Sequence, residues 1–420
     1  MRSRSVACYK RPRARGIVRL PAAIILAVVS SAHPVWAQST PTLGTTGLYL
    51  IPSFRVSESF DDNIFGSSSN RQSDFISRFY PGLQGGYRSE PLTLLATGGF
   101  EADVFAKHPE QNDVTAGWNA GLNLRYAPIR RLTFGTNISY TETKSLPTLN
   151  QVVADLAIAN PLNPANTLLQ GRLKTTLLSV SSSGGYQFTP RTAGNAAFSY
   201  TQSTQEAGAS NTAYGAQIGL SHHFTQRDIG TFADIQNVFE SPGTPTRYTN
   251  APTIGWTRRL TPLVTLSLQA GPQFSFDGNV GAYANASLAY DYKVADYLVR
   301  ASLTYLHAEG FVVGQAGPTT TETIASRLAF APFRLFEIDV GTTTSRFSGS
   351  TTSGRPGASS TAPHTTTYGL TAGASYRVFK WLTARTSYGF YYQQQSVGGD
   401  IPHNIVLVGV NITYPFRVDE

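Results

Sequence analysis

The chain has 420 residues, a formal net charge of +8 and only 14 % charged residues. With 38 glycines and 21 tyrosines, the composition is typical of a β-rich protein and argues against long helices. A single cysteine excludes an internal disulfide framework.

The N-terminus has the pattern of a secretory signal peptide over residues 1–37. Seven basic side chains and no acidic one lie within residues 1–19, and an apolar run follows over 20–29. Because Ala37 then stands directly before the polar Gln38, we expect cleavage between these two residues. A short periplasmic N-terminal segment over 38–46 would begin the mature chain.

Loss of this leader changes the charge balance. It removes seven of the 33 basic residues and none of the 25 acidic ones, which leaves 26 basic against 25 acidic residues. The charge of the whole chain therefore does not indicate nucleic-acid binding. Cys8 lies in the leader, so we expect no cysteine chemistry in the mature chain. After the leader, no apolar run approaches the roughly 20 residues of a membrane helix.

Apolar and polar side chains alternate through most of residues 47–420. The pattern is clearest over 264–292, where two stretches of more than ten residues flank a short loop, Asp277 to Asn279. Such strands exceed the usual five or six residues and suit a tilted crossing of about 25 to 30 Å of hydrocarbon. We therefore predict an all-β fold, a transmembrane antiparallel up-and-down β-barrel of about 18 strands.

The predicted strands follow one another along the chain with few long gaps. Their ranges are 48–60, 75–87, 92–104, 114–126, 132–142, 173–188, 193–201, 212–224, 229–239, 248–256, 264–276, 280–292, 297–307, 323–330, 335–347, 365–378, 382–392 and 403–416. Tight turns alternate with longer connections rich in Gly, Ser, Thr and Pro. We expect the tight turns to face the periplasm and the long loops to face outside.

The longest connection covers residues 143–170. Its middle, 151–159, could form a short amphipathic helix. A connection of this length in a tight meander is either a lid or a constriction folded into the barrel. The other long connections are expected outside the barrel and include 61–73, 308–322 and 348–364.

Aromatic residues gather at both ends of the predicted strands. Tyr87, Tyr126 and Trp256 precede tight turns, whereas Tyr140 and Tyr392 precede long loops. Two such rows are typical of the aromatic girdles of a membrane barrel. A soluble sandwich or propeller is the alternative fold, but it would have no reason to ring its outer surface with aromatic side chains.

The first two strands resemble a known family. The segment from Leu50 to Phe65, followed by 73–76 and 80–83, is similar to the opening of outer-membrane β-barrel porins associated with exopolysaccharide production (beta-barrel porin 2-like). The resemblance implies a bacterial outer-membrane location, a barrel and a link to polysaccharide secretion. The ending Tyr414-Pro415-Phe416 resembles the aromatic terminus that the barrel-assembly machinery reads, although 417–420 extend beyond it.

If apolar side chains face lipid, their neighbours line the lumen. The charged residues assigned to the lumen in this way are Arg55, Arg78, Arg125, Arg300, Arg327, Arg377 and Arg385, together with Glu101, Asp103, Asp234, Asp291, Glu337 and Asp339. A lumen with both charges and many hydroxyl and amide groups suits polar solutes. The alternative is that these charges are merely paired or solvated, without a dedicated ligand.

Metal ligation is not indicated. Asp61, Asp62, Asn63 and Asp74 lack the regular spacing of a calcium loop, so a solvated turn is expected. His222 and His223 are adjacent in a strand and point to opposite faces. Three further histidines, His307, His364 and His403, lie singly near loop ends and are interpreted as ordinary surface residues. We expect no cofactor.

Enzyme chemistry is not expected either. The sequence has no Gly-x-Ser-x-Gly elbow, no phosphate-binding loop and no Ser, His and acid set that the strand register would bring together.

Two functions follow from these observations. The first is a porin-like channel that passes polar solutes or assists exopolysaccharide export, with 143–170 narrowing the pore. The second is a plugged structural or surface-interaction barrel without transport activity. The expected partners are outer-membrane lipid and lipopolysaccharide, the barrel-assembly machinery, and polysaccharide or small polar solutes. The sequence leaves open whether the barrel is a homo-oligomer.

Overall fold

The computed structural model describes residues 47–145, 165–167, 172–206, 208, 210–276, 278–349, 364–396 and 399–417. The predicted signal peptide, the segment 38–46 and the predicted helix over 151–159 lie outside these residues. Among the described residues, no helix has the length and hydrophobicity of a membrane span.

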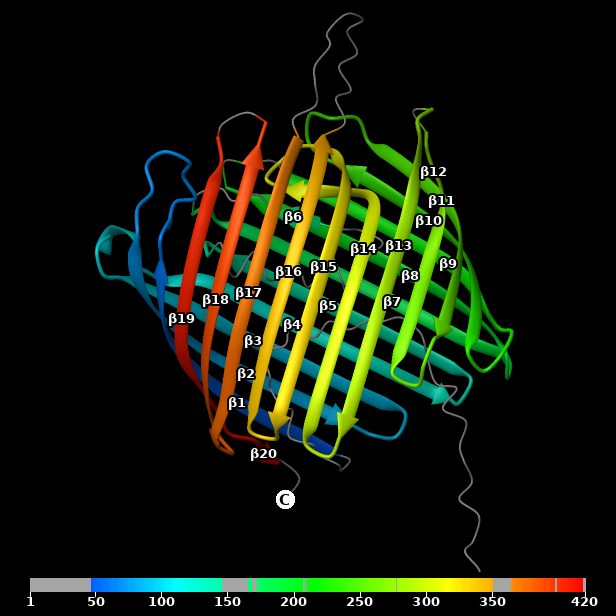
Figure 1. Cartoon of the computed structure of the whole chain (residues 1–420), viewed down its shortest axis with the longest axis horizontal. Helices are drawn as coiled ribbons and strands as arrows, with labels where there is room; N and C mark the ends of the chain where they lie inside the picture. Colours follow the sequence, from blue (N-terminus) through cyan, green and yellow to red (C-terminus); the bar gives the residue numbers. More distant parts are fainter. Residues whose placement is uncertain are drawn as a thin grey trace, which may run out of the picture.

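Eighteen long antiparallel strands form a closed barrel (Figure 1). Each strand pairs with the next, and the last long strand pairs with the first along Ser53 to Asp61, which closes the sheet. This confirms the predicted fold. The strands are β1 (Gly47–Asp61), β2 (Asp74–Arg88), β3 (Leu92–Phe105), β4 (Asp113–Ile129), β5 (Leu132–Thr143), β7 (Thr175–Thr189), β8 (Thr192–Gln205), β9 (Ser210–His223), β10 (Asp228–Glu240), β11 (Arg247–Arg259), β12 (Val264–Ser275), β13 (Val280–Val294), β14 (Tyr297–Val313), β15 (Pro318–Phe333), β16 (Phe336–Gly349), β17 (His364–Phe379), β18 (Leu382–Gln395) and β19 (Ile401–Thr413).

Three short elements complete the described secondary structure: η1 (Pro109–Gln111), β6 (Ala165–Thr167) and β20 (Phe416–Arg417). The predicted last strand, 403–416, is interrupted, because β19 ends at Thr413 and Pro415 has no N–H for the ladder. The chain then resumes as β20, which pairs with Tyr49 and Leu50 of β1.

The outer wall is an apolar belt between two sets of aromatic rings. On β2, exposed Phe75, Phe79 and Leu83 alternate with side chains that point inward. Ring pairs lie at the tight-turn end, as in Tyr186 and Phe188, and others lie at the loop end, as in Tyr368 and Tyr392. A closed barrel leaves no sheet edge unpaired in lipid, and this wall places the chain in the bacterial outer membrane.

Strand β10 departs from the predicted orientation. Ala233, Ile235 and Phe239 point inward and are 2 to 4 % exposed, so Asp234, which was expected in the lumen, lies on the outer wall. The prediction was wrong here because it assumed that apolar side chains face lipid. The inward apolar side chains of β10 instead pack against a protein segment inside the barrel, and Phe239 contacts Phe311 there.

Candidate functional site

The end of β14 leaves the wall and enters the lumen. Its last six residues, Ala308–Val313, are all buried, whereas buried and less buried residues alternate along wall strands such as β10. Figure 1 shows this end of β14 and the following turn bent inside the barrel before β15 begins. Of the connection predicted as an external loop over 308–322, residues 308–317 therefore form an internal segment, whereas 318–322 belong to the wall strand β15.

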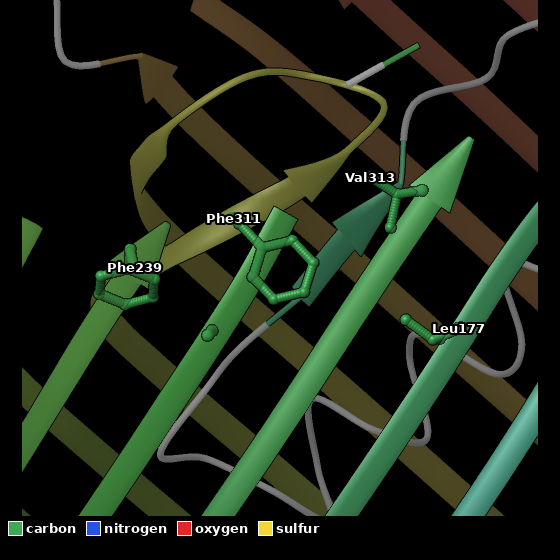
Figure 2. Packing of buried hydrophobic residues seen from close by; sticks show 5 residues of the cluster. Leu177, Phe239, Phe311 and Val313 are labelled. Carbon is green, nitrogen blue, oxygen red and sulfur yellow. The ribbon is translucent and has the colours of Figure 1, made fainter. Parts of the chain in front are cut away.

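This internal segment crosses to strands on another part of the wall. Phe311 and Val313 cluster with Leu177 of β7, Ala213 of β9 and Phe239 of β10 (Figure 2). Around the barrel, β10 is four strands away from β14, so the contact spans the lumen and does not follow the wall. The segment therefore narrows the half of the barrel that carries the long connections.

Polar contacts hold the internal segment in place. Arg247 of β11 forms a 2.6 Å ion pair with Glu309. Asn211 of β9 donates through Nδ2 to the carbonyl oxygens of Val312 at 3.2 Å and Gln315 at 2.7 Å. These contacts fix the main chain as well as the side chains, so the apolar cluster and the polar anchors act together.

The predicted constriction over 143–170 is described only in part. Of this connection, the structure describes 143–145 and β6, which pairs in parallel with Phe311 to Val313. The remainder lies outside the described residues.

The internal position of β14 had a signal in the sequence, since Phe311-Val312-Val313 is an apolar run without alternation inside a connection expected to be polar.

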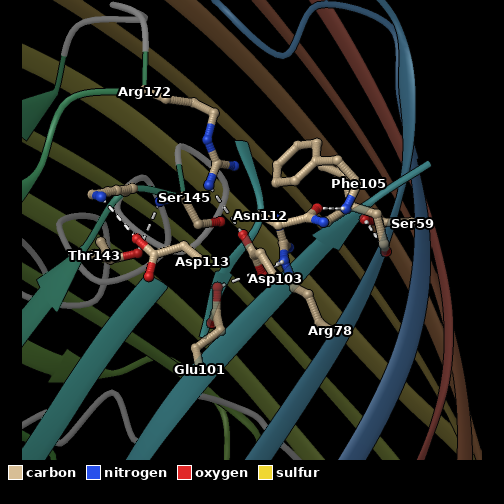
Figure 3. Close-up of polar contacts among 12 residues, drawn as sticks. Ser59, Arg78, Glu101, Asp103, Phe105, Asn112, Asp113, Thr143, Ser145 and Arg172 are labelled. Atoms are coloured by element: carbon tan, nitrogen blue, oxygen red, sulfur yellow. Dashed lines mark hydrogen bonds and ion pairs between the residues drawn. The ribbon is translucent and has the colours of Figure 1, made fainter. Parts of the chain in front are cut away.

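A buried cluster of charges lies on β2 and β3. Arg78 Nε is 3.1 Å from Asp103 Oδ1 and 3.6 Å from Glu101 Oε1 (Figure 3). Arg172, which the sequence analysis missed, reaches the same carboxylate with Nη2 3.3 Å from Asp103 Oδ2. Its guanidinium also lies over the ring of Phe105, 4.4 Å from the centroid. Burial lowers the pKa of Arg172, and the charge of Asp103 opposes this shift. The ion pair ties the end of the long connection to the barrel wall.

A second group of charges lies on the opposite side of the β1–β19 seam. Arg327 on β15, Glu337 and Asp339 on β16 and Arg385 on β18 share the face opposite to the exposed apolar side chains. A Cβ added at Gly373 would lie 2.7 Å from Asp339 Oδ1, so this glycine makes room for the carboxylate.

The other predicted lumen residues flank these two groups. Arg300 Nε lies 3.6 Å from Asp291 Oδ1 in an exposed pair near the tight-turn ends of β13 and β14. Arg55 lies over the ring of Tyr80, 5.0 Å from the centroid. Arg125 and Arg377 lie near the tight-turn ends of β4 and β17.

The charged residues of the two groups are arranged along the hydrogen-bonding direction of the sheet. From Glu337 near the tight-turn end of β16, register neighbours lead to Arg385 on β18, then to Arg78 on β2 and Asp103 near the loop end of β3, through Ser375, Gly409 and Ser57. Strands in membrane barrels tilt by about 35 to 45°, so a row of register neighbours runs obliquely along the wall, from one end of the barrel toward the other. Opposite charges thus form one spiral path.

The wall formed by β7 to β12 is uncharged and, apart from the inward apolar side chains that pack on the internal segment, polar. Between their ends, the fully described strands β7 to β12 carry no charged side chain on the lumen face. Hydroxyl and amide groups dominate there, as in Ser179, Ser199, Asn237, Thr253 and Gln273. The lumen therefore has a charged side and a hydroxyl and amide side.

Two carboxylates expected in a solvated turn are buried instead. Asp61 Oδ1 lies 2.7 Å from Nε2 of His403, which is fully buried and is not the surface residue that was predicted. Asp74, also fully buried, lies 2.7 Å from His108 Nδ1 and accepts the backbone N–H groups of Lys107 and His108.

The structure also brings Asp62 close to Asp61 and His403, with potential metal-ligand atoms within 4.8 Å of one another. The Asp62 oxygens already accept both nitrogens of Asn404 at 2.7 Å, and Asp62 also pairs with Arg71. These contacts hold the connection between β1 and β2 against β19, so the cluster has a structural role.

No protein-family model and no curated protein matches the sequence. Solved structures with a similar fold include OpdO of Pseudomonas aeruginosa, with 8 % identity, a TM-score of 0.45 and coverage of 89 % of this chain and 98 % of that chain. The outer membrane protein OpdK of the same organism gives 10 %, 0.43, 88 % and 100 %. The siderophore receptor PirA of Acinetobacter baumannii gives 7 %, 0.44, 88 % and 81 %. We therefore base the function on the residues of this barrel itself.

Proposed function

We propose that the barrel is an outer-membrane channel for small polar solutes. The observation that carries this proposal is the row of opposite charges between Glu337 and Asp103, which faces a wall of hydroxyl and amide groups. Such a lumen replaces the hydration shell of a charged or hydroxylated solute step by step. Transport would be diffusive, with selection by size at the internal segment of β14 and by charge along the row of charged residues.

Passage of saccharides is the finer part of the proposal. Its support is the resemblance of residues 50–65 to exopolysaccharide-associated porins, together with the hydroxyl and amide wall. Single-channel conductance of the folded protein in a planar bilayer tests both parts. We expect steady openings in potassium chloride, and transient block when anionic or neutral oligosaccharides are added. Openings without any block would remove the saccharide part and leave the channel.

A plugged barrel is the second candidate function. The observation that favours it is the internal segment, since Phe311, Val312 and Val313 are at most 1 % exposed and occupy lumen space. A correctly folded barrel that shows no conductance would support this alternative. A variant without residues 310–316 would then open a path if that segment forms the plug.

A further inference from the structure

Asp234 lies on the outer wall at the middle of the apolar belt. Its ladder partner on β11 is Pro252, which is four residues from Tyr248 and four residues from Trp256. Both rings are exposed on the same outer face, at opposite ends of the belt. At a rise of about 3.3 Å per residue, Asp234 is about 13 Å along the strand from either aromatic level.

The surroundings of Asp234 confirm its depth. Its other ladder partner is Ile218 of β9, and Ile218 and Ile254 are each 72 % exposed on the outer wall. Phe232, one outward position away on β10, is 53 % exposed. The carboxylate is thus framed by side chains that would otherwise contact acyl chains, where ionisable groups are rare and costly.

Two amides accompany the carboxylate on the outer wall. Asn250 Nδ2 donates to Asp234 Oδ1 at 2.7 Å, and Gln236 Nε2 donates to Asp234 Oδ2 at 3.0 Å. No other hydrogen bond reaches these three side chains from the described residues. One N–H of each amide and both amide oxygens therefore still require partners, which hydrocarbon cannot supply.

Small residues also lie beside this group on the outer wall. Small side chains flank it, with Ala216 beside Gln236 on β9 and Ala270 beside Ile254 on β12. The ladder between β11 and β12 is interrupted from Ala251 to Thr253, where Pro252 and Pro272 lack N–H groups. Small and polar residues are characteristic of protein contacts inside a membrane.

We propose that Asp234, Gln236 and Asn250 form a contact with a second copy of this chain. Each Asp234 oxygen already accepts one N–H, so a partner must present donors for the two amide oxygens and acceptors for the two free N–H groups. An identical group related by a two-fold axis presents this combination, since each amide carries both a donor and an acceptor.

Single-cysteine cross-linking in native membranes tests this contact. Ile218→Cys and Ile254→Cys are each placed in a chain that carries Cys8→Ser, and the membrane-permeant oxidant copper phenanthroline is added to join neighbouring thiols as a disulfide. We expect a product of twice the mass for at least one of the two positions. Val408→Cys, on the outer wall of β19 and 58 % exposed, is the matched control and should give no such product.

A triple replacement of Asp234, Gln236 and Asn250 by leucine should abolish the product while the barrel keeps its heat-modifiable mobility. If that variant does not fold, the cross-linking results for the single-cysteine variants with Asp234, Gln236 and Asn250 unchanged still test the contact. Absence of a product at both positions, equal products at all three, or a product with a different protein would overturn the contact. The outcome is independent of whether the lumen conducts.

Discussion

Replacement of Phe311 by alanine tests whether the internal end of β14 controls the lumen. The ring is 1 % exposed and packs with Leu177, Ala213 and Phe239. Truncation of a buried phenylalanine to alanine costs about 3 to 5 kcal/mol. The eighteen-stranded wall does not depend on this contact. We therefore expect the lost free energy to weaken docking of the internal segment and not to unfold the barrel.

The expected change in docking of the internal segment follows from this free-energy cost. Each 1.4 kcal/mol changes an equilibrium tenfold, so about 3 kcal/mol lowers the ratio of docked to undocked segment roughly 100-fold. The segment would then leave the lumen for part of the time. We expect a higher mean single-channel conductance with more frequent transitions, and faster protease cleavage within 308–317 from the extracellular side.

Phe276→Ala is the matched control, because this ring is 83 % exposed and lies outside the lumen. It should leave both conductance and cleavage unchanged. If Phe311→Ala also leaves both unchanged, while circular dichroism shows an intact barrel, the internal segment does not limit the pore and the reasoning is refuted.

Three further changes test other parts of the structure. Replacing Arg55 and Arg385 with glutamine removes two positive charges from the lumen, so it should lower the permeability of anions relative to cations, seen as a shift in reversal potential across a salt gradient; no shift would mean that these charges do not face the conducting path. His403→Leu leaves Asp61 without its buried partner, which costs about 1 to 3 kcal/mol. The urea midpoint of unfolding should therefore fall, and an unchanged midpoint would contradict a structural role of the Asp61–His403 contact. Deletion of 148–166 should raise conductance if the long connection narrows the pore, and equal conductance would exclude that role.

Some contacts lie beyond any local pattern. His403 and Asp61 are 342 residues apart in the chain and meet only because β19 pairs with β1. A histidine near a loop end has the same sequence environment whether it is exposed or buried. The structure also brings Arg172 to Asp103, and nothing in the spacing of those residues indicates the pair.

The sequence by itself determined the strands, because a segment between lipid and water must alternate at period two along its whole length. The order of the eighteen long strands and the apolar belt follow from that local constraint, whereas the inward course of Ala308–Val313 and the end of β19 at Thr413 do not. The faces of β10 were decided only by tertiary structure. An apolar face is equally well covered by lipid or by protein, and only the path of β14 shows that Ile235 and Phe239 turn toward protein while Asp234 turns outward.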